Sequence, residues 1–207
     1  MYTHDIALKK DILEIESLMD LSISKMLGEN LNSQQLEAAK ESMGLDTKLI
    51  EDKTYFLVKK DDSIVGTGGY SIRKTLFGGN HTPNRSDDLL IPNKDSAKIR
   101  AMYTHPDWTR KGVGSYVLEL SENKVHKLGF RSTELMATVS GILLYEKRGY
   151  EVLEQIEYVS KLGNKVPMYK MKKILWVLKS NWTYSKSRFM NAVASLWPVI
   201  FVMDVVI

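Results

Sequence analysis

The chain has 207 residues, of which 43% are hydrophobic and 26% charged, a balance that predicts one folded domain with room for an appendage. Its formal net charge is +4, without a basic run or stripe, so nothing indicates nucleic-acid binding. A mildly basic protein would suit an anionic small ligand equally well. The absence of cysteine excludes disulfides, thiolate metal sites and a cysteine nucleophile.

The first residues, MYTHDIALKKDILEIE, carry charges where a signal peptide needs an apolar run. We therefore expect a cytoplasmic enzyme. No metal is expected, because the histidines are scattered without the spacing of metal ligands: His4, His81, His105 and His126.

Two helices are predicted after a short strand at Tyr2–Leu8. Asp11–Leu27 places apolar residues mostly at steps of three and four, which indicates an amphipathic helix. A second helix is expected from Ser33 to Gly44. Both helices can serve core packing alone, or their connection can help to wall a substrate site.

A β-hairpin is predicted from Thr54–Lys60 and Ser63–Lys74. The second strand contains Gly66, Gly68 and Gly69, which predict a bulge or a close backbone approach. Residues 75–95 then form a long loop rich in proline, glycine, asparagine and aspartate. Such a loop is either a substrate lid or a plain connection.

The stretch Ala97–Thr104 alternates as a strand, with odd-numbered residues expected on one face and even-numbered residues on the other. Pro106 ends it, and a helix follows from Lys111 or Gly112 to Gly129. Glu134–Val139 is the next strand. Because a helix separates the two strands, we expect a right-handed parallel crossover.

The remaining predicted elements are a short helix at Gly141–Arg148 and two strands at Glu151–Ser160 and Val166–Ile174. The element order βααβββαβαββ predicts a mixed α/β sheet.

The composition changes in residues 175–207, here called the C-terminal extension. It holds three of the four tryptophans and only four charged residues: Lys179, Lys186, Arg188 and Asp204. Its apolar end is short for a membrane span and is interrupted by Pro198. It is expected to pack on the domain or on a second subunit, to associate with a membrane, or to be a poorly ordered appendage or sequence not native to the fold.

The segment Thr109–Ser115, TRKGVGS, stands at a predicted helix start. Amides in the first turn of a helix lack acceptors and, with the helix dipole, form an anion site. Gly112 and Gly114 would let a ligand approach the backbone, and Arg110 and Lys111 add charge. The pattern suits a pyrophosphate, and a plain helix start with two glycines is the alternative. It is neither a P-loop nor a full GxGxxG fingerprint.

With its surroundings, this segment resembles the GNAT N-acetyltransferase superfamily. Thr109–Gly114 follows the phrase THPDW and matches the signature Q/R-x-x-G-x-G/A except at Thr109, beside which Arg110 offers the charge. LLYEKRGYEV (Leu143–Val152) is similar to the family's LYEKxGF element, and VPMYKMKKIL is similar to its last strand. The resemblance covers about residues 1–174 and leaves the C-terminal extension outside.

The resemblance implies an α/β (α+β) fold with a mixed, mostly antiparallel sheet of six to seven strands and helices on both faces. The sheet would be splayed between its fourth and fifth strands, Ala97–Thr104 and Glu134–Val139. Residues 1–174 would form an N-acetyltransferase domain that uses acetyl-CoA and no metal. The acceptor would be a primary amine of a small molecule or a protein.

The resemblance also implies roles for individual residues. The backbone of Arg110, Lys111, Gly112, Val113, Gly114 and Ser115 would hold the CoA pyrophosphate. The strand edge at Met102, Tyr103 and Thr104 would pair with the pantetheine arm, and an N–H near Met102 or Tyr103 would polarise the thioester carbonyl. Tyr145 would protonate the departing thiolate, since a phenol is protonated at neutral pH; a half-buried helix aromatic is the alternative.

A general base is not assigned. Many relatives carry a glutamate on the fourth strand, where this chain has Lys98 and Arg100. Glu134, His105 and a water chain to a remote acid stay open. If Lys98 and Arg100 line the site, they would favour an anionic or carboxylate-bearing acceptor.

Two other functions remain alternatives. The chain could be a non-catalytic acyl-CoA-binding module, or an interaction module that uses the C-terminal extension. A membrane-surface role depends on that extension entirely. The same apolar segment is compatible with a homodimer.

Overall fold

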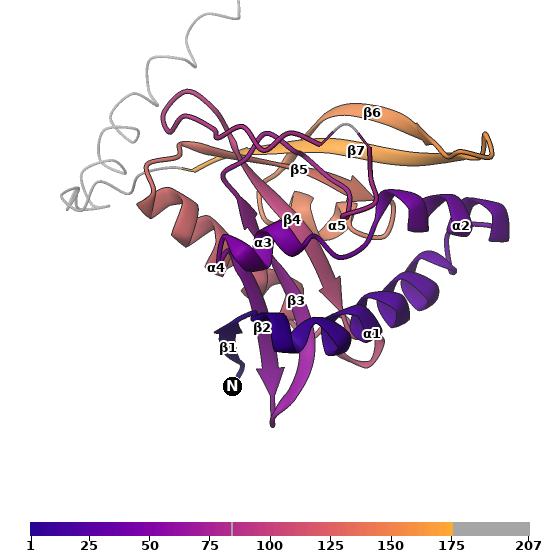
Figure 1. The fold of residues 1–207 in the computed structure, drawn as a ribbon, viewed down its shortest axis with the longest axis horizontal. Helices are drawn as coiled ribbons and strands as arrows, with labels where there is room; N and C mark the ends of the chain where they lie inside the picture. The colour runs from indigo at the N-terminus through magenta and orange to yellow at the C-terminus, as the bar shows by residue number, and fades with distance from the viewer. Residues whose placement is uncertain (84, 176–207) are drawn as a thin grey trace, which may run out of the picture. The chain divides into compact units, whose positions relative to one another are not determined.

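The computed structural model describes residues 1–83 and 85–175. One sheet of seven strands runs in the order β1-β2-β3-β4-β5-β7-β6 (Figure 1). β4 and β5 pair in parallel, and the other neighbouring strands pair antiparallel. The mixed, mostly antiparallel sheet predicted above is confirmed. The strands are β1 (Thr3–Ile6), β2 (Tyr55–Lys60), β3 (Ser63–Ser71), β4 (Ala97–Thr104), β5 (Ser132–Thr138), β6 (Glu151–Val159) and β7 (Lys165–Ile174).

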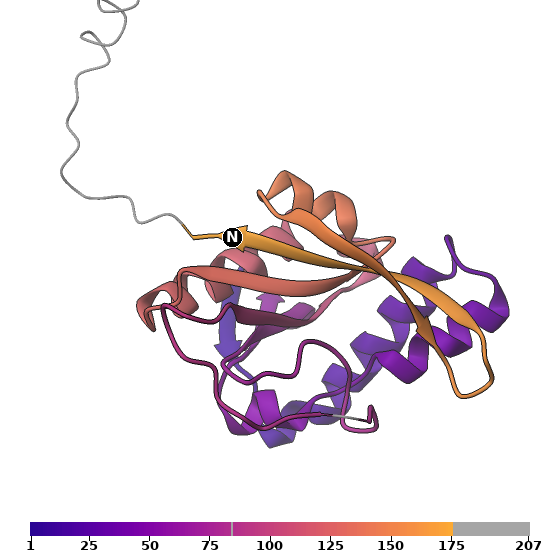
Figure 2. The same cartoon turned by 90° about the horizontal axis from the view of Figure 1, so that it is seen from above.

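Helices cover both faces of this sheet, as Figure 2 shows. One face carries α1 and its π-helical continuation η2, followed by α2; α4 and α5 lie on the other face. The helical elements are η1 (Lys9–Asp11), α1 (Ile12–Ser22), η2 (Ile23–Leu27), α2 (Ser33–Ser42), α3 (Thr47–Glu51), η3 (Pro106–Trp108), α4 (Val113–Lys127) and α5 (Ile142–Lys147).

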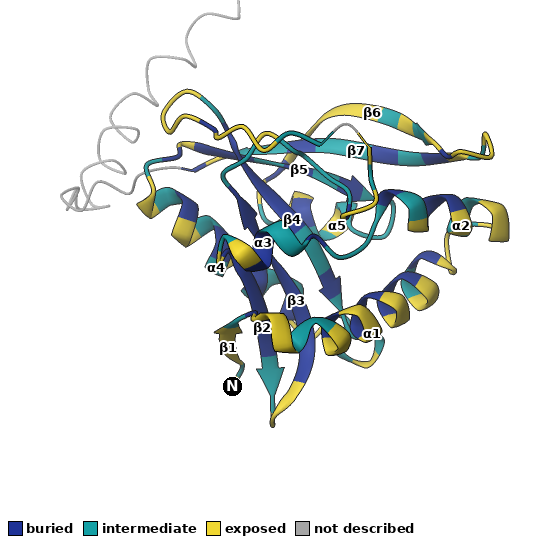
Figure 3. Cartoon of the chain, viewed as in Figure 1, coloured by how far each residue is buried: buried dark blue, intermediate teal, exposed yellow. Residues whose placement is uncertain are grey.

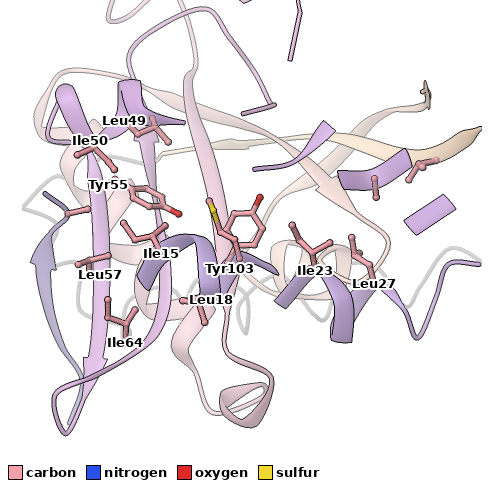
Figure 4. Packing of buried hydrophobic residues seen from close by; sticks show 14 of the residues in the cluster. Ile15, Leu18, Ile23, Leu27, Leu49, Ile50, Tyr55, Leu57, Ile64 and Tyr103 are labelled. Carbon is pink, nitrogen blue, oxygen red and sulfur yellow. The ribbon is translucent and has the colours of Figure 1, made fainter. Parts of the chain in front are cut away.

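The core is divided between the two faces of the sheet. On the α1 face, Ile15 and Leu18 pack with Tyr55, Leu57 and Tyr103 (Figure 4). On the α4 face, a second set of buried side chains gathers: Ala97, Ile99, Leu118, Val125, Phe130 and Leu135. The central strands are therefore buried on both faces, whereas β6 at the edge is largely exposed (Figure 3).

Glycines in β3 let α4 approach the sheet closely. A Cβ added at Gly66 would stand 2.4 Å from Val113 Cγ1, and one at Gly68 would stand 2.8 Å from Val117 Cγ1. The register between β2 and β3 also shifts between Val58 and Lys59, because β3 has one extra residue between the pairs Val58–Gly66 and Lys59–Ile64. The predicted bulge and the predicted close approach are both present.

The simple alternation expected for β4 is wrong. Tyr103 pairs with Thr67, but Arg100 pairs with Gly69, so β4 contains one extra residue, and Ala101 there has a φ of 51°. This bulge turns the following side chains to the opposite face. Tyr103 consequently packs on the α1 side, while Ile99 packs on the α4 side.

Other boundaries differ modestly from expectation. The short helix α3 was not predicted; Asp46 caps it by accepting from the Lys48 amide at 3.1 Å. β3 ends at Ser71 rather than Lys74, and β5 begins at Ser132 rather than Glu134. The parallel crossover from β4 through α4 to β5 is confirmed.

Contacts within the chain divide it into residues 1–175 and residues 176–207. The second unit lies outside the described residues, so the three interpretations of the C-terminal extension stay predictions. Within residues 1–83 and 85–175, none of the helices combines the length and the apolar character needed to span a membrane.

Because α4 lies close to β3, we expect a methyl group added at Gly66 to lower the stability of the domain. Gly66→Ala should destabilise the domain by about 1–3 kcal/mol, because overpacking against Val113 forces a shift. The melting temperature should fall by roughly 3–10 °C. Adding Val113→Ala should restore part of the loss, and Ser63→Ala, at an exposed position of the same strand, is the control. An unchanged melting temperature for Gly66→Ala would contradict this packing.

Candidate active site

A cavity of about 370 Å³ opens where β4 and β5 part. These strands pair only at Ala97–Thr133 and Lys98–Glu134; beyond this point they separate and the cavity begins. Residues from the end of α1, η2, the end of α2, β4, η3, the start of α4, the end of β5 and α5 line it: Ser22, Ile23, Met26, Leu27, Met43, Met102, Tyr103, Thr104, Trp108, Thr109, Arg110, Gly112, Val113, Gly114, Ser115, Thr138, Ser140, Gly141, Leu143, Leu144, Tyr145 and Lys147.

Every residue assigned to the site from the sequence lines this cavity except Lys111. The Lys111 ammonium instead lies 4.9 Å from the centre of the Trp108 ring, which is a cation–π contact. The backbone carbonyl of Lys111 accepts a hydrogen bond from the Tyr2 hydroxyl at 2.8 Å. Arg110 lines the cavity and Lys111 does not, so a charge contribution from Lys111 stays a prediction.

The amides of residues 110–115 form an unpaired set at the start of α4. Among the described residues, none of these amides donates a hydrogen bond, and the first paired amide is that of Tyr116, which donates to the Gly112 carbonyl at 3.0 Å. Arg110 and Gly112 have φ values of 60° and 89°. Turns of this kind and helix N-termini both present amides to anions.

Glycine is required at positions 112 and 114 for different reasons. A Cβ at Gly112 would meet nothing within 4 Å, so the position is open, and its left-handed φ favours glycine. A Cβ at Gly114 would stand 2.8 Å from Leu144 Cδ2. Gly114 therefore lets α5 approach α4, a packing role that the sequence reasoning had not considered.

One edge of β4 is left open by the parting of the strands. Tyr103 and Thr104 pair with β3 on one side, while the described pairing with β5 stops at Lys98. Met102, Tyr103 and Thr104 line the cavity. Such an edge can accept an extended ligand as an added strand.

Tyr145 stands on α5 at the other side of the opening. Its side chain is 7% exposed, and its ring packs edge-on against Tyr150 with centroids 5.8 Å apart. Burial raises the pKa of Tyr145 above its ordinary value, which keeps the phenol protonated. Within the described part of the chain its hydroxyl has no hydrogen-bond partner, although it lines the cavity.

A second cavity of about 90 Å³ adjoins the first. The two share Met43, Met102, Tyr103, Thr138 and Tyr145, so both tyrosines stand at the junction. The opening between β4 and β5 thus leads from the unpaired amides on one side to a smaller chamber on the other.

Comparison with known proteins agrees with this geometry. A family model described as the acetyltransferase (GNAT) family matches residues 21–150. The chain belongs to the GNAT family. No curated protein sequence matches it significantly.

Solved GNAT structures share the fold at low sequence identity. A GCN5-related N-acetyltransferase from Rhodopseudomonas palustris is 16% identical, with a TM-score of 0.61 over 84% of this chain and 95% of that chain. The PaiA N-acetyltransferase from Thermoplasma acidophilum, in complex with coenzyme A, is 14% identical, with a TM-score of 0.55 over 84% and 99%. The ribosomal-protein-S18-alanine N-acetyltransferase from Escherichia coli is 14% identical, with a TM-score of 0.53 over 87% and 98%.

The cationic face expected on β4 of this GNAT domain is neutralised in large part. Lys98 lies outside both cavities and its ammonium contacts Glu134 Oε2 at 2.8 Å. Arg100 lines the second cavity, but it donates to Asp46 at 2.9 Å and to the Gly78 and Thr75 carbonyls at 2.7 and 2.8 Å. These bonds hold Arg100 as a buried structural group.

Neither candidate base lines a cavity. Burial alone would raise the pKa of Glu134, but the Lys98 hydrogen bond and charge outweigh it, so the pKa is lowered and the carboxylate is a weak base. His105 lies in the turn after β4, where its Nδ1 accepts from the Asp107 amide at 3.2 Å.

The apolar spacing of the sequence did not reveal that η2 walls the cavity. The end of the first predicted helix walls the first cavity with Ser22, Ile23, Met26 and Leu27. The connection between the first two predicted helices, which was one candidate wall, does not line it. A π-helical turn is frequent at functional sites, yet its register has no signature in the apolar spacing of the sequence.

Proposed function

We propose that this protein transfers the acetyl group of acetyl-CoA to a primary amine of a small molecule or a protein by direct attack. The observation that carries this function is the convergence of three features on one cavity: the unpaired amides of residues 110–115, the open edge of β4, and the buried phenol of Tyr145. The coenzyme A complex of the similarly folded PaiA enzyme supports the choice of co-substrate.

Each part of acetyl-CoA has a group suited to hold it. The amides from Arg110 to Ser115 would bind the pyrophosphate, with the Arg110 guanidinium adding positive charge. Backbone groups of Met102, Tyr103 and Thr104 would pair with the amides of the pantetheine arm. The thioester would then lie near the β4 bulge, between Tyr103 and Tyr145.

The chemistry balances with these groups. The amine nitrogen attacks the acetyl carbon, and an N–H of Met102 or Tyr103 would stabilise the negative charge on its oxygen. The C–S bond breaks as the N–C bond forms, and Tyr145 gives its proton to the leaving sulfur. The proton that the amine nitrogen loses returns to the Tyr145 oxygen directly or through water, so the phenol is regenerated.

Turnover with a panel of amines tests the proposal directly. The full chain is incubated with acetyl-CoA and small primary amines or peptides with free N-termini, and thiol release is measured together with acetylated product by mass spectrometry. We expect amine-dependent thiol release. Tight binding of CoA without turnover of any amine would instead favour the non-catalytic acyl-CoA-binding module.

Gly112→Asp should weaken CoA binding by about 100-fold or more, because it places a carboxylate at the amide site and forces a side chain into a left-handed conformation. The measurement is a calorimetric titration with CoA. Gly163→Asp is a matched control, since Gly163 also has a positive φ, of 81°, and open space around its Cβ position. An unchanged dissociation constant for Gly112→Asp would refute the anion site.

Tyr145→Phe should lower kcat by about 100-fold, the scale of a lost general acid, while the dissociation constant for CoA changes little. Tyr150→Phe is the control, because the Tyr150 hydroxyl pairs with Thr133 at 2.8 Å and lines neither cavity. If kcat for Tyr145→Phe equals that of the wild type, Tyr145 is not the acid.

A further inference from the structure

The second cavity is walled mainly by apolar side chains. The loop after β3 contributes Leu76 and Phe77, and the remaining apolar members come from the end of α2, β4, β5 and β7: Met43, Ile99, Ala101, Met102, Leu135, Met136 and Met168. Four of these are methionines, whose flexible thioethers adapt to ligands of different shape. A buried methylene placed there would be stabilised by the hydrophobic effect.

The charged residues that line the two cavities are all cationic. Among residues 1–83 and 85–175, no aspartate or glutamate lines either cavity. Asp46, 2% exposed, contacts both Arg85 at 2.6 Å and Arg100 at 2.9 Å. Two guanidinium groups share one carboxylate, so a surplus positive charge remains beside the cavity that Arg100 lines.

The same arginines fix the loop that closes the chamber. Arg100 donates to the carbonyls of Thr75 and Gly78, at either end of the Leu76–Phe77 pair, and Arg85 donates to the Gly79 carbonyl at 2.7 Å. Phe77 also packs edge-on against Tyr158 of β6. Hydrogen bonds from both arginines thus hold the apolar wall in place, with the two guanidinium groups beside it.

We propose that the second cavity takes the acceptor, and that the acceptor is a primary amine carried by a neutral apolar group without a second cation. This assignment rests on the proposed acetyl transfer. A second ammonium would be buried without a carboxylate partner and beside a surplus positive charge, which is strongly unfavourable. The single reacting amine is delivered to the junction at Tyr103 and Tyr145.

A matched pair of amines tests this assignment on the full chain. Pentylamine and 1,4-diaminobutane have nearly the same size and differ by a methyl or an ammonium at the far end. We expect kcat/KM to be at least about 30-fold higher for pentylamine. From propylamine to butylamine to pentylamine it should rise about two- to fourfold per methylene. Equal or better turnover of the diamine would overturn the proposal.

A third amine separates carboxylate recognition from apolar recognition. 5-Aminopentanoate carries a carboxylate at the far end, which Arg100 would attract if its charge were available to ligands. We expect its kcat/KM to fall between those of the other two amines. A value above that of pentylamine would overturn the apolar assignment.

A carboxylate placed in the wall should reverse the selectivity. Leu76→Glu supplies the missing counter-charge at a partly exposed loop position, so the ratio of pentylamine to diamine kcat/KM should fall by about tenfold or more. Leu89→Glu is the control, because Leu89 is 59% exposed and lies outside both cavities. With CoA affinity and melting temperature retained, an unchanged ratio in Leu76→Glu would overturn the proposal.

Binding of the amines to the CoA complex distinguishes this inference from the proposed function. If no amine is acetylated but pentylamine binds the complex more tightly than the diamine, the acceptor assignment stands and the transfer reaction fails. If the diamine is acetylated preferentially, the transfer stands and the acceptor assignment fails. If no amine binds or reacts, both fail.

Discussion

The site depends on one feature of the sheet, the end of pairing between β4 and β5. Backbone amides and carbonyls are costly to leave unpaired inside a protein, and here the described register stops after two residue pairs. The free edge of β4 is tolerated because it lines a cavity rather than packed side chains. An extended ligand that pairs with this edge would replace the hydrogen bonds that β5 does not make. The proposed binding of acetyl-CoA would thus follow from an interruption of strand pairing.

The bulge at Ala101 connects this opening to the packing on both faces. By reversing the side-chain alternation it sends Tyr103 to the α1 face, where the Gly44 amide donates to its hydroxyl at 3.2 Å, while Met102 stays against the α4 face. Burial raises the pKa of Tyr103 to about 12. The glycines of β3 then allow α4 to lie close to the sheet, which sets the amides of its first turn at the mouth of the cavity. Distant strand residues therefore position the unpaired amides that we propose as the anion site.

Local patterns were sufficient to predict most elements and the helix start that lines the first cavity, because strand runs, the helix start at TRKGVGS and the Tyr145 segment each depend on neighbouring residues. The sequence did not reveal what depends on the partner across the sheet. Lys98 and Arg100 looked like an available cationic face, yet their partners Glu134 and Asp46 come from other elements. Similarly, the β4 bulge was missed because its cause is the register with β3, and η2 because a π-turn barely changes the apolar spacing.

Electrostatics also constrains how the proposed reaction handles protons. The described walls of the cavities contain no carboxylate, and burial keeps Tyr145 protonated by raising its pKa. The described walls would offer an ammonium ion no carboxylate, so under the proposed reaction the amine would lose its first proton to solvent before it enters. The amine would then react as a free base, the form in which its nitrogen is nucleophilic. Under this arrangement the protein needs an acid for the leaving sulfur more than a base for the amine, which is consistent with one buried phenol at the junction and two candidate bases outside it.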